Sequence, residues 1–292
     1  MNVVYFIQQT LNGLTIGIIY GLIALGFSMV YKAVGCLNFC HTVSVMLGAF
    51  LSYTFIVDFS FSPWLTFFLV IILLLVYGWA VNHFFFRYFT NTSKTIFMLV
   101  AISLSGVLQQ AALIIWGPEA RAIPNILGAG NIDIAGAVFP VQSLLLFLIS
   151  LLSLIVLLLF FNRTKFGLSM RIAAEDSEAA SLMGVNVELT RSATFAITAL
   201  LGGIAGFLIA PLFGVTIDIG QSLALKMFVA AVVGGVGYLP GAIGAGVLVG
   251  ILESLSSAYI SSGWRDLIIF TAGIAVLAVR PLGIFRKSVT KH

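Results

Sequence analysis

The stretch "VQSLLLFLISLLSLIVLLLFF", residues 141–161, contains no charged residue. A helix of about 20 apolar residues is long enough to cross the hydrocarbon layer of a membrane, so this stretch predicts a membrane-spanning helix. The rest of the chain has the same character, because 61% of its residues are hydrophobic and 8% are charged. Soluble proteins average roughly 25% charged residues. The composition therefore predicts a protein whose main solvent is lipid.

Eight further apolar stretches predict additional spans, near 11–31, 42–58, 64–84, 96–116, 192–213, 223–237, 240–260 and 266–281. The stretch 223–237 is short and glycine-rich, which makes it a candidate for a broken or re-entrant helix. We therefore expect an all-α fold, a polytopic integral membrane helix bundle with 8–9 transmembrane segments and one or two broken or re-entrant helices. We expect one transmembrane domain over 1–292, with its main cytoplasmic loop at 162–191.

The distribution of basic residues predicts the orientation of these spans. Lys and Arg are enriched in cytoplasmic loops. If 162–191 is cytoplasmic, eleven of the fourteen basic residues fall inside: Lys32, Arg87, Lys94, Arg163, Lys165, Arg171, Arg191, Arg280, Arg286, Lys287 and Lys291. This places the N-terminus outside and the C-terminus in the cytoplasm. Because these residues are scattered between apolar spans, the basic pI does not indicate a nucleic-acid surface.

The sequence contains no set of residues typical of catalysis. Cys36, Cys40 and His41 could form part of a metal site, but a fourth ligand is missing and packing is the favoured role. We find no nucleophile elbow, no His-Glu-x-x-His and no phosphate-binding loop. Glu253 lies inside a span, where a charge is costly. Three interpretations are open for Glu253: a functional role, pairing with a partner such as Lys226, or a side chain that extends outward to water. We prefer the last. The pattern favours transport without a metal or cofactor on this chain.

The most heavily charged stretch is "RIAAEDSEAASLMGVNVELTR", residues 171–191. It predicts a short amphipathic helix over 172–183, with one stripe formed by Ile172, Ala179 and Met183. Its acidic residues complement the helix dipole near the first turn. Gly184 is placed to end the helix and Asn186 to cap the next one. Such a helix suits docking onto another protein, although a solvated loop joining two spans is the simpler alternative.

Two segments interrupt the predicted spans. They are "GCLNFCHTVSVMLGAF" (35–50) and "VVGGVGYLPGAIGAG" (232–246). Broken backbone at membrane depth is tolerated where protein or a water-filled cavity surrounds it, and in transporters it often lines the substrate route. A tight turn at the cytoplasmic interface is the alternative, equally favoured for the second segment and slightly preferred for the first. The candidate residues of a substrate path are Asn38, Phe39, His41, Gly234, Gly235 and Gly237.

Several motifs resemble a known family. "EAASLMG" (178–184) is similar to the Glu-Ala-Ala-x-x-x-Gly loop of ATP-binding-cassette importer permeases. "GLIALGFSMVYKAVGCLNFCHTVSVMLGAF" (21–50) is similar to the N-terminal signature of the branched-chain amino acid permease family. The stretch 226–259 and the closing "RPLGIF" (280–285) resemble its C-terminal half. The resemblance covers nearly the whole chain and points to the shorter, LivH type of permease. Cys40 and Thr42 stand where the family usually has Ala and Gly, so the substrate stays open.

This resemblance implies a subunit of an ABC transporter in a bacterial-type inner membrane, which forms the path for branched-chain or related amino acids. The implied partners are a homologous second permease, two cytoplasmic ATPases that carry ATP-Mg, and an extracytoplasmic substrate-binding protein. In the family, the loop contributes a coupling helix that seats on an ATPase. The residues that match the motif here are Glu178, Ala179, Ala180 and Gly184, and the candidate coupling loop also includes Arg171, Glu175 and Asp176. Urea, amides or another small polar solute remain alternative substrates. A self-sufficient channel, an ion-coupled carrier and an intramembrane enzyme are less favoured.

Overall fold

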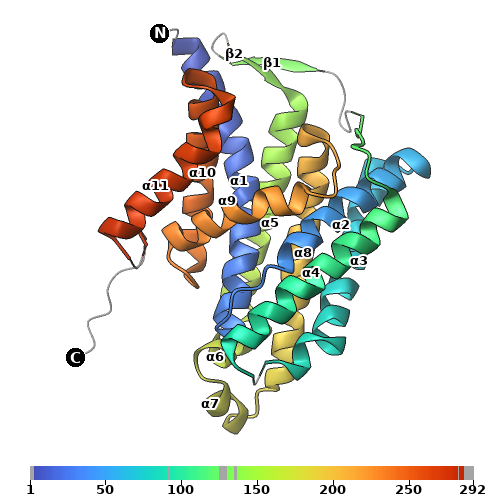
Figure 1. The fold of residues 1–292 in the computed structure, drawn as a ribbon, viewed down its shortest axis with the longest axis vertical. Coiled ribbons are helices and arrows are strands. Elements are labelled where there is room, and N and C mark those ends of the chain that lie inside the picture. The colour runs from blue at the N-terminus through green and yellow to red at the C-terminus, as the bar shows by residue number, and fades with distance from the viewer. Residues whose placement is uncertain (1–2, 91, 125–129, 135–136, 282, 286–292) are drawn as a thin grey trace. The chain divides into compact units, whose positions relative to one another are not determined.

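The computed structural model describes residues 3–90, 92–124, 130–134, 137–281 and 283–285. Arg286, Lys287 and Lys291, which the orientation argument placed in the cytoplasm, lie outside this part of the chain. Within it, eight helical segments are long and apolar enough to cross a membrane. The predicted helical membrane fold is confirmed (Figure 1).

The spanning helices coincide with the predicted apolar stretches. They are α1 (Val3–Val34), α2 (His41–Tyr53) with the π-helical η1 (Thr54–Asp58), α3 (Pro63–Phe84) with η2 (Phe86–Tyr88), α4 (Lys94–Trp116), α5 (Val141–Arg163), α8 (Val187–Phe213), α10 (Leu239–Tyr259), and η3 (Ser262–Trp264) with α11 (Arg265–Val279). The seventh predicted stretch is α9 (Ile219–Gly234), whose 16 residues extend about 24 Å at 1.5 Å per residue. This is shorter than the hydrocarbon core of about 30 Å.

The contacts divide the chain into two compact units, and whether 1–292 forms one domain stays a prediction. Unit 1 comprises 1–28, 125–151 and 225–292. In it, Gly13, Gly17 and Gly21 of α1 face Gly246 and Gly250 of α10. A Cβ on Gly17 would lie 2.7 Å from the carbonyl oxygen of Val247, so the two backbones touch with no room for a side chain. This is the close packing that small residues allow between membrane helices.

Unit 2 comprises 29–124 and 152–224. Helix α8 packs against both α2 and α3, and glycines again set the contact distance (Figure 1). Two short helices of the charged loop, α6 (Lys165–Glu175) and α7 (Ser177–Leu182), contact each other and α8. The unit therefore contains both the charged loop and the first interruption at 35–50.

A small antiparallel hairpin was not predicted. Strands β1 (Asn131–Ile134) and β2 (Ala137–Pro140) pair in the register Asn131 to Pro140. The Gln8 side chain of α1 donates a hydrogen bond to the Val138 carbonyl, 3.1 Å away. Four-residue strands inside a loop leave little hydrophobic periodicity in the sequence, which is why the pattern did not reveal them.

Candidate functional site: the charged loop and two interruptions

The charged loop folds as two helices, so the single predicted helix over 172–183 is wrong. The break falls at Asp176, whose backbone is extended (φ −147°, ψ 106°). Its carboxylate accepts hydrogen bonds from the backbone N–H groups of Glu178 and Ala179, each at 2.9 Å. An Asp side chain that caps the following turn competes with continuation of the preceding helix. Asp176 therefore ends α6 and begins α7.

The two terminal signals of the loop are confirmed. Gly184 directly follows Met183, the C-cap of α7, and has φ +82°, a conformation that favours glycine. The Asn186 side chain accepts a hydrogen bond from the Leu189 N–H at 2.9 Å and so caps α8. A Cβ at position 184 would meet no atom within 4 Å. Glycine is therefore favoured here by its positive φ and not by a lack of space for a side chain.

The predicted residues of the loop occupy distinct environments. Glu175, Asp176 and Glu178 are exposed, and Glu175 lies 3.9 Å from the ammonium group of Lys32. Ala180 is fully buried, whereas Ala179 and Arg171 are partly buried. The predicted stripe of Ile172, Ala179 and Met183 is wrong, because the break at Asp176 rotates α7 relative to α6.

An exposed apolar tip is the feature of this loop that the sequence analysis missed. Leu182 is 91% exposed and Met183 is 65% exposed, at the end of α7. We call Ser181–Gly184 the loop tip. Two large apolar side chains beside three exposed acids form a surface suited to an apolar pocket with a basic rim. The sequence did contain a signal for this tip, because Leu182 and Met183 directly precede Gly184, the glycine that follows α7.

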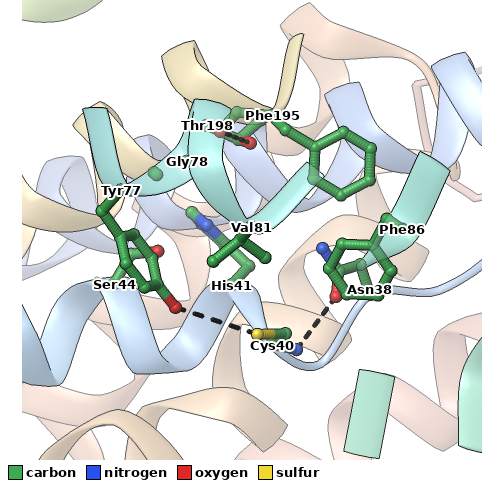
Figure 2. Close-up of a pocket in the computed structure, with 11 residues that line it drawn as sticks. Asn38, Cys40, His41, Ser44, Tyr77, Gly78, Val81, Phe86, Phe195 and Thr198 are labelled. Atoms are coloured by element: carbon green, nitrogen blue, oxygen red, sulfur yellow. Dashed lines mark hydrogen bonds between the residues drawn. The ribbon is translucent and has the colours of Figure 1, made fainter. Parts of the chain in front are cut away.

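Within the predicted interruption at 35–50, residues 35–40 form a turn between α1 and α2 and 41–50 belong to α2; Gly35 has φ +72°. Beside it lies a pocket lined by both polar and apolar side chains (Figure 2). Its lining residues are Asn38, Cys40, His41, Ser44, Tyr77, Gly78, Val81, Phe86, Phe195, Thr198 and Ala199. The cavity volume of about 20 Å³ holds about one water molecule. In this conformation the pocket does not admit an amino acid.

Hydrogen bonds within this turn organise the pocket. The Asn38 side-chain oxygen accepts from the Cys40 N–H at 3.0 Å, and the Cys40 Sγ lies 3.9 Å from the Tyr77 hydroxyl oxygen (Figure 2). Burial raises the pKa of the Cys40 thiol to about 12, and the Tyr77 contact opposes this only in part. Since the thiolate is the nucleophile and metal ligand, this raised pKa favours the packing role for Cys40 over a reactive or metal-ligating one. Cys36 packs in the same apolar cluster, which supports the packing role.

The predicted path residues separate into two groups. Asn38 and His41 line the pocket in unit 2, whereas Phe39 is partly exposed and does not line it. Gly234 is the last residue of α9, and Gly235 and Gly237 belong to the turn between α9 and α10 in unit 1. Gly235 (φ +96°) and Gly237 (φ +79°) have backbone conformations that favour glycine. Their role in a path stays a prediction.

Glu253 is buried and paired, so the preferred expectation that it reaches outward to water is wrong. Only 2% of the residue is exposed, and its Oε1 lies 2.6 Å from the Nζ of Lys226 in α9. Arg265 also contacts it, with Nε 3.3 Å from the same oxygen. Neighbouring cations on α9 and α11 pair with one oxygen of this carboxylate, which a single span read in isolation does not reveal.

Long apolar helices with a charged loop between them define a multi-pass membrane protein. Residues 9–277 match the family described as branched-chain amino acid transport system / permease component. The chain is 33% identical to the high-affinity branched-chain amino acid transport system permease protein LivH of Salmonella typhimurium, over 96% of this chain and 95% of the relative. This chain belongs to that permease family.

Other relatives indicate the breadth of the match. The permease protein BraD of Pseudomonas aeruginosa, from a system of the same description, is 31% identical over 97% of this chain and 96% of its own. An autoinducer 2 import system permease protein, LsrC of an Enterobacter species, is 29% identical over 63% of this chain and 55% of its own. Similar permeases are therefore named for chemically different cargoes.

Proposed function

We propose that this chain is the permease subunit of an ATP-driven importer for branched-chain amino acids or closely related amino acids. The observation that carries the proposal is the match to relatives named for this transport over nearly the full length of both chains. Urea, short amides and other small polar solutes are the competing cargoes, since a partial relative is named for autoinducer 2.

In this proposal the chain works with a homologous second permease, two cytoplasmic ATPases that carry ATP-Mg, and an extracytoplasmic binding protein. The loop tip docks on an ATPase, with Leu182 in an apolar pocket and Glu175, Asp176 and Glu178 facing basic residues. The exposure of Leu182 supports this assignment, because an apolar side chain that is 91% exposed in a cytoplasmic loop gains most by being covered. The N-terminus lies outside and the C-terminus in the cytoplasm.

The first test is co-purification of the tagged chain from its native membrane, followed by identification of its companions. We expect two ATPase chains and a second permease. Glu178→Lys reverses a charge beside the loop tip, and Gly184→Pro cannot adopt φ +82°. Both changes should remove the ATPases and reduce ATP-driven uptake to background, while the protein stays in the membrane.

Glu119→Lys is the matched control, because it makes the same charge reversal at an exposed residue of another loop. It should retain both the ATPases and uptake. Cargo is assigned by uptake of radiolabelled leucine, isoleucine and valine into proteoliposomes in competition with urea and acetamide. A wild-type chain that purifies alone and folded contradicts the importer assignment.

A further inference from the structure

Four charged side chains of unit 1 form a closed ring of alternating sign. Lys226 lies 2.6 Å from Glu253 and 3.3 Å from Asp266, and Arg265 lies 3.3 Å from Glu253 and 3.5 Å from Asp266. Each acid therefore contacts both bases, and the net charge of the ring is zero. We call these four residues the charge ring.

The charge ring joins three helices at one point. Lys226 comes from α9, Glu253 from α10, and Arg265 and Asp266 from the first turn of α11. The side chains of Lys226 and Glu253 are 8% and 3% exposed, whereas those of Arg265 and Asp266 are 34% and 54% exposed. The Lys226 ammonium also lies 5.8 Å from the centre of the buried Tyr20 ring, within cation–π range. The link from Lys226 to Glu253 is thus made where water does not compete, whereas the link to Asp266 reaches a half-exposed carboxylate.

Helix α9 has 16 residues, fewer than any of the eight candidate spans, so contacts with neighbouring helices contribute to holding it in place. Lys226 lies in the middle of α9, and at the C-terminal end of this helix a strap formed by Gly283, Ile284 and Phe285 contacts the turn to α10. The Ile284 N–H donates to the Val233 carbonyl at 2.8 Å, and a Cβ on Gly283 would lie 2.6 Å from the Gly235 nitrogen. The charge ring and the strap hold α9 at two separate points.

We propose that the charge ring is a positioning device, which holds α9 at the place that transport requires. Lys226 is its central residue, since both ionic links from α9 to the neighbouring helices pass through its ammonium group. The proposal rests on the importer function for its uptake readout, and its structural readout is independent of that function.

Variants that neutralise one or both of Glu253 and Lys226 distinguish a positioning role of the charge ring from a simple need for zero net charge. Glu253→Gln leaves the ring with one excess positive charge, and Lys226→Met leaves one excess negative charge. The double variant has zero net charge but no ionic link to α9, because Arg265 and Asp266 both belong to α11. Removing one partner of a buried pair is strongly destabilising, whereas replacing both is often tolerated. Each single variant should lower the melting temperature by about 6 °C or more, and the double variant should recover most of this loss.

The position of α9 is read from a spin label at Leu225→Cys, a site that is 55% exposed next to Lys226. In the double variant we expect the label to become more mobile, despite the recovered melting temperature. Uptake should stay at about one tenth of wild type or lower, since small displacements of a positioning group cost ten- to a hundredfold in rate.

Lys226→Arg keeps the cation. It should retain at least half of the wild-type uptake and lose at most half as much melting temperature as Lys226→Met. Arg87→Gln, in an exposed pair with Glu188 at 2.8 Å, is the control and should change melting little.

A double variant with wild-type label mobility overturns the proposal, as does one that recovers uptake together with melting temperature. Single variants that melt and transport like wild type overturn it as well. A wild-type complex that imports none of the tested solutes contradicts the proposed function instead, and the label mobility then decides on the charge ring alone.

Discussion

At the scale of single residues, glycines set the distances between helices. A Cβ on Gly48 of α2 would lie 2.5 Å from the carbonyl oxygen of Gly203 and 2.6 Å from its Cα, both backbone atoms of α8. Backbone cannot rotate away as a side chain can, so an added methyl group pushes the two helices apart. Gly106 of α4 is different, since a Cβ there meets no atom within 4 Å.

We therefore predict opposite results for two identical substitutions. Gly48→Ala should destabilise the protein by about 1–3 kcal/mol through overpacking. Gly106→Ala should be neutral or stabilise it by up to about 1 kcal/mol, because alanine loses less backbone entropy in a helix. Thermal melting of the two variants in one detergent checks this. Equal melting temperatures would show that the α2–α8 contact is not as close as the structure has it.

At the scale of elements, Asp176 divides the charged loop into two helices and thereby orients the loop tip. Its carboxylate satisfies two N–H groups at the start of α7, which has only six residues and little stability of its own. The exposed direction of Leu182 follows from this break. A continuous helix would present a different face.

Asp176→Ala should cost about 1 kcal/mol of α7 stability and weaken ATPase binding severalfold. Asp176→Asn keeps a capping oxygen without the charge and should bind more tightly than the alanine variant. The measurement is the affinity of the purified ATPase subunit for the permease in nanodiscs. If the asparagine and alanine variants bind equally weakly, the charge of Asp176 matters rather than its cap.

At the scale of the whole molecule, the proposed orientation assigns each loop to one side of the membrane. Ser181 in the loop tip and Ser261 before η3 are both exposed, and the basic residues place them on opposite sides. The native thiols give little background, since Cys36 and Cys40 are buried.

An impermeant maleimide added to intact cells should therefore label Ser261→Cys and leave Ser181→Cys unlabelled. Permeabilised cells should show labelling of both. The reverse pattern in intact cells would invert the orientation and remove the loop tip from the cytoplasm, where the proposed ATPases lie.

The amino-acid sequence by itself determined the spans and the ends of the helices around the charged loop. Residues 141–161 are apolar without interruption, and this local property decides where lipid is the better solvent. Gly184 and Asn186 act on neighbours within a few positions, so their roles were also legible from the chain. Asp176 shows the limit even locally, because the sequence did not tell whether its side chain would face outward or cap a new helix.

Only the tertiary structure decided which distant residues meet. Asn38 and His41 come together with Tyr77 and Thr198 from three helices and a turn, and no spacing in the sequence predicts that pocket. Glu253 read alone suggested a side chain that escapes to water, whereas packing places Lys226, 27 positions away, within 2.6 Å of it. A charge inside a membrane is satisfied by whichever helix lies beside it, and neighbouring helices are chosen by packing rather than by sequence order.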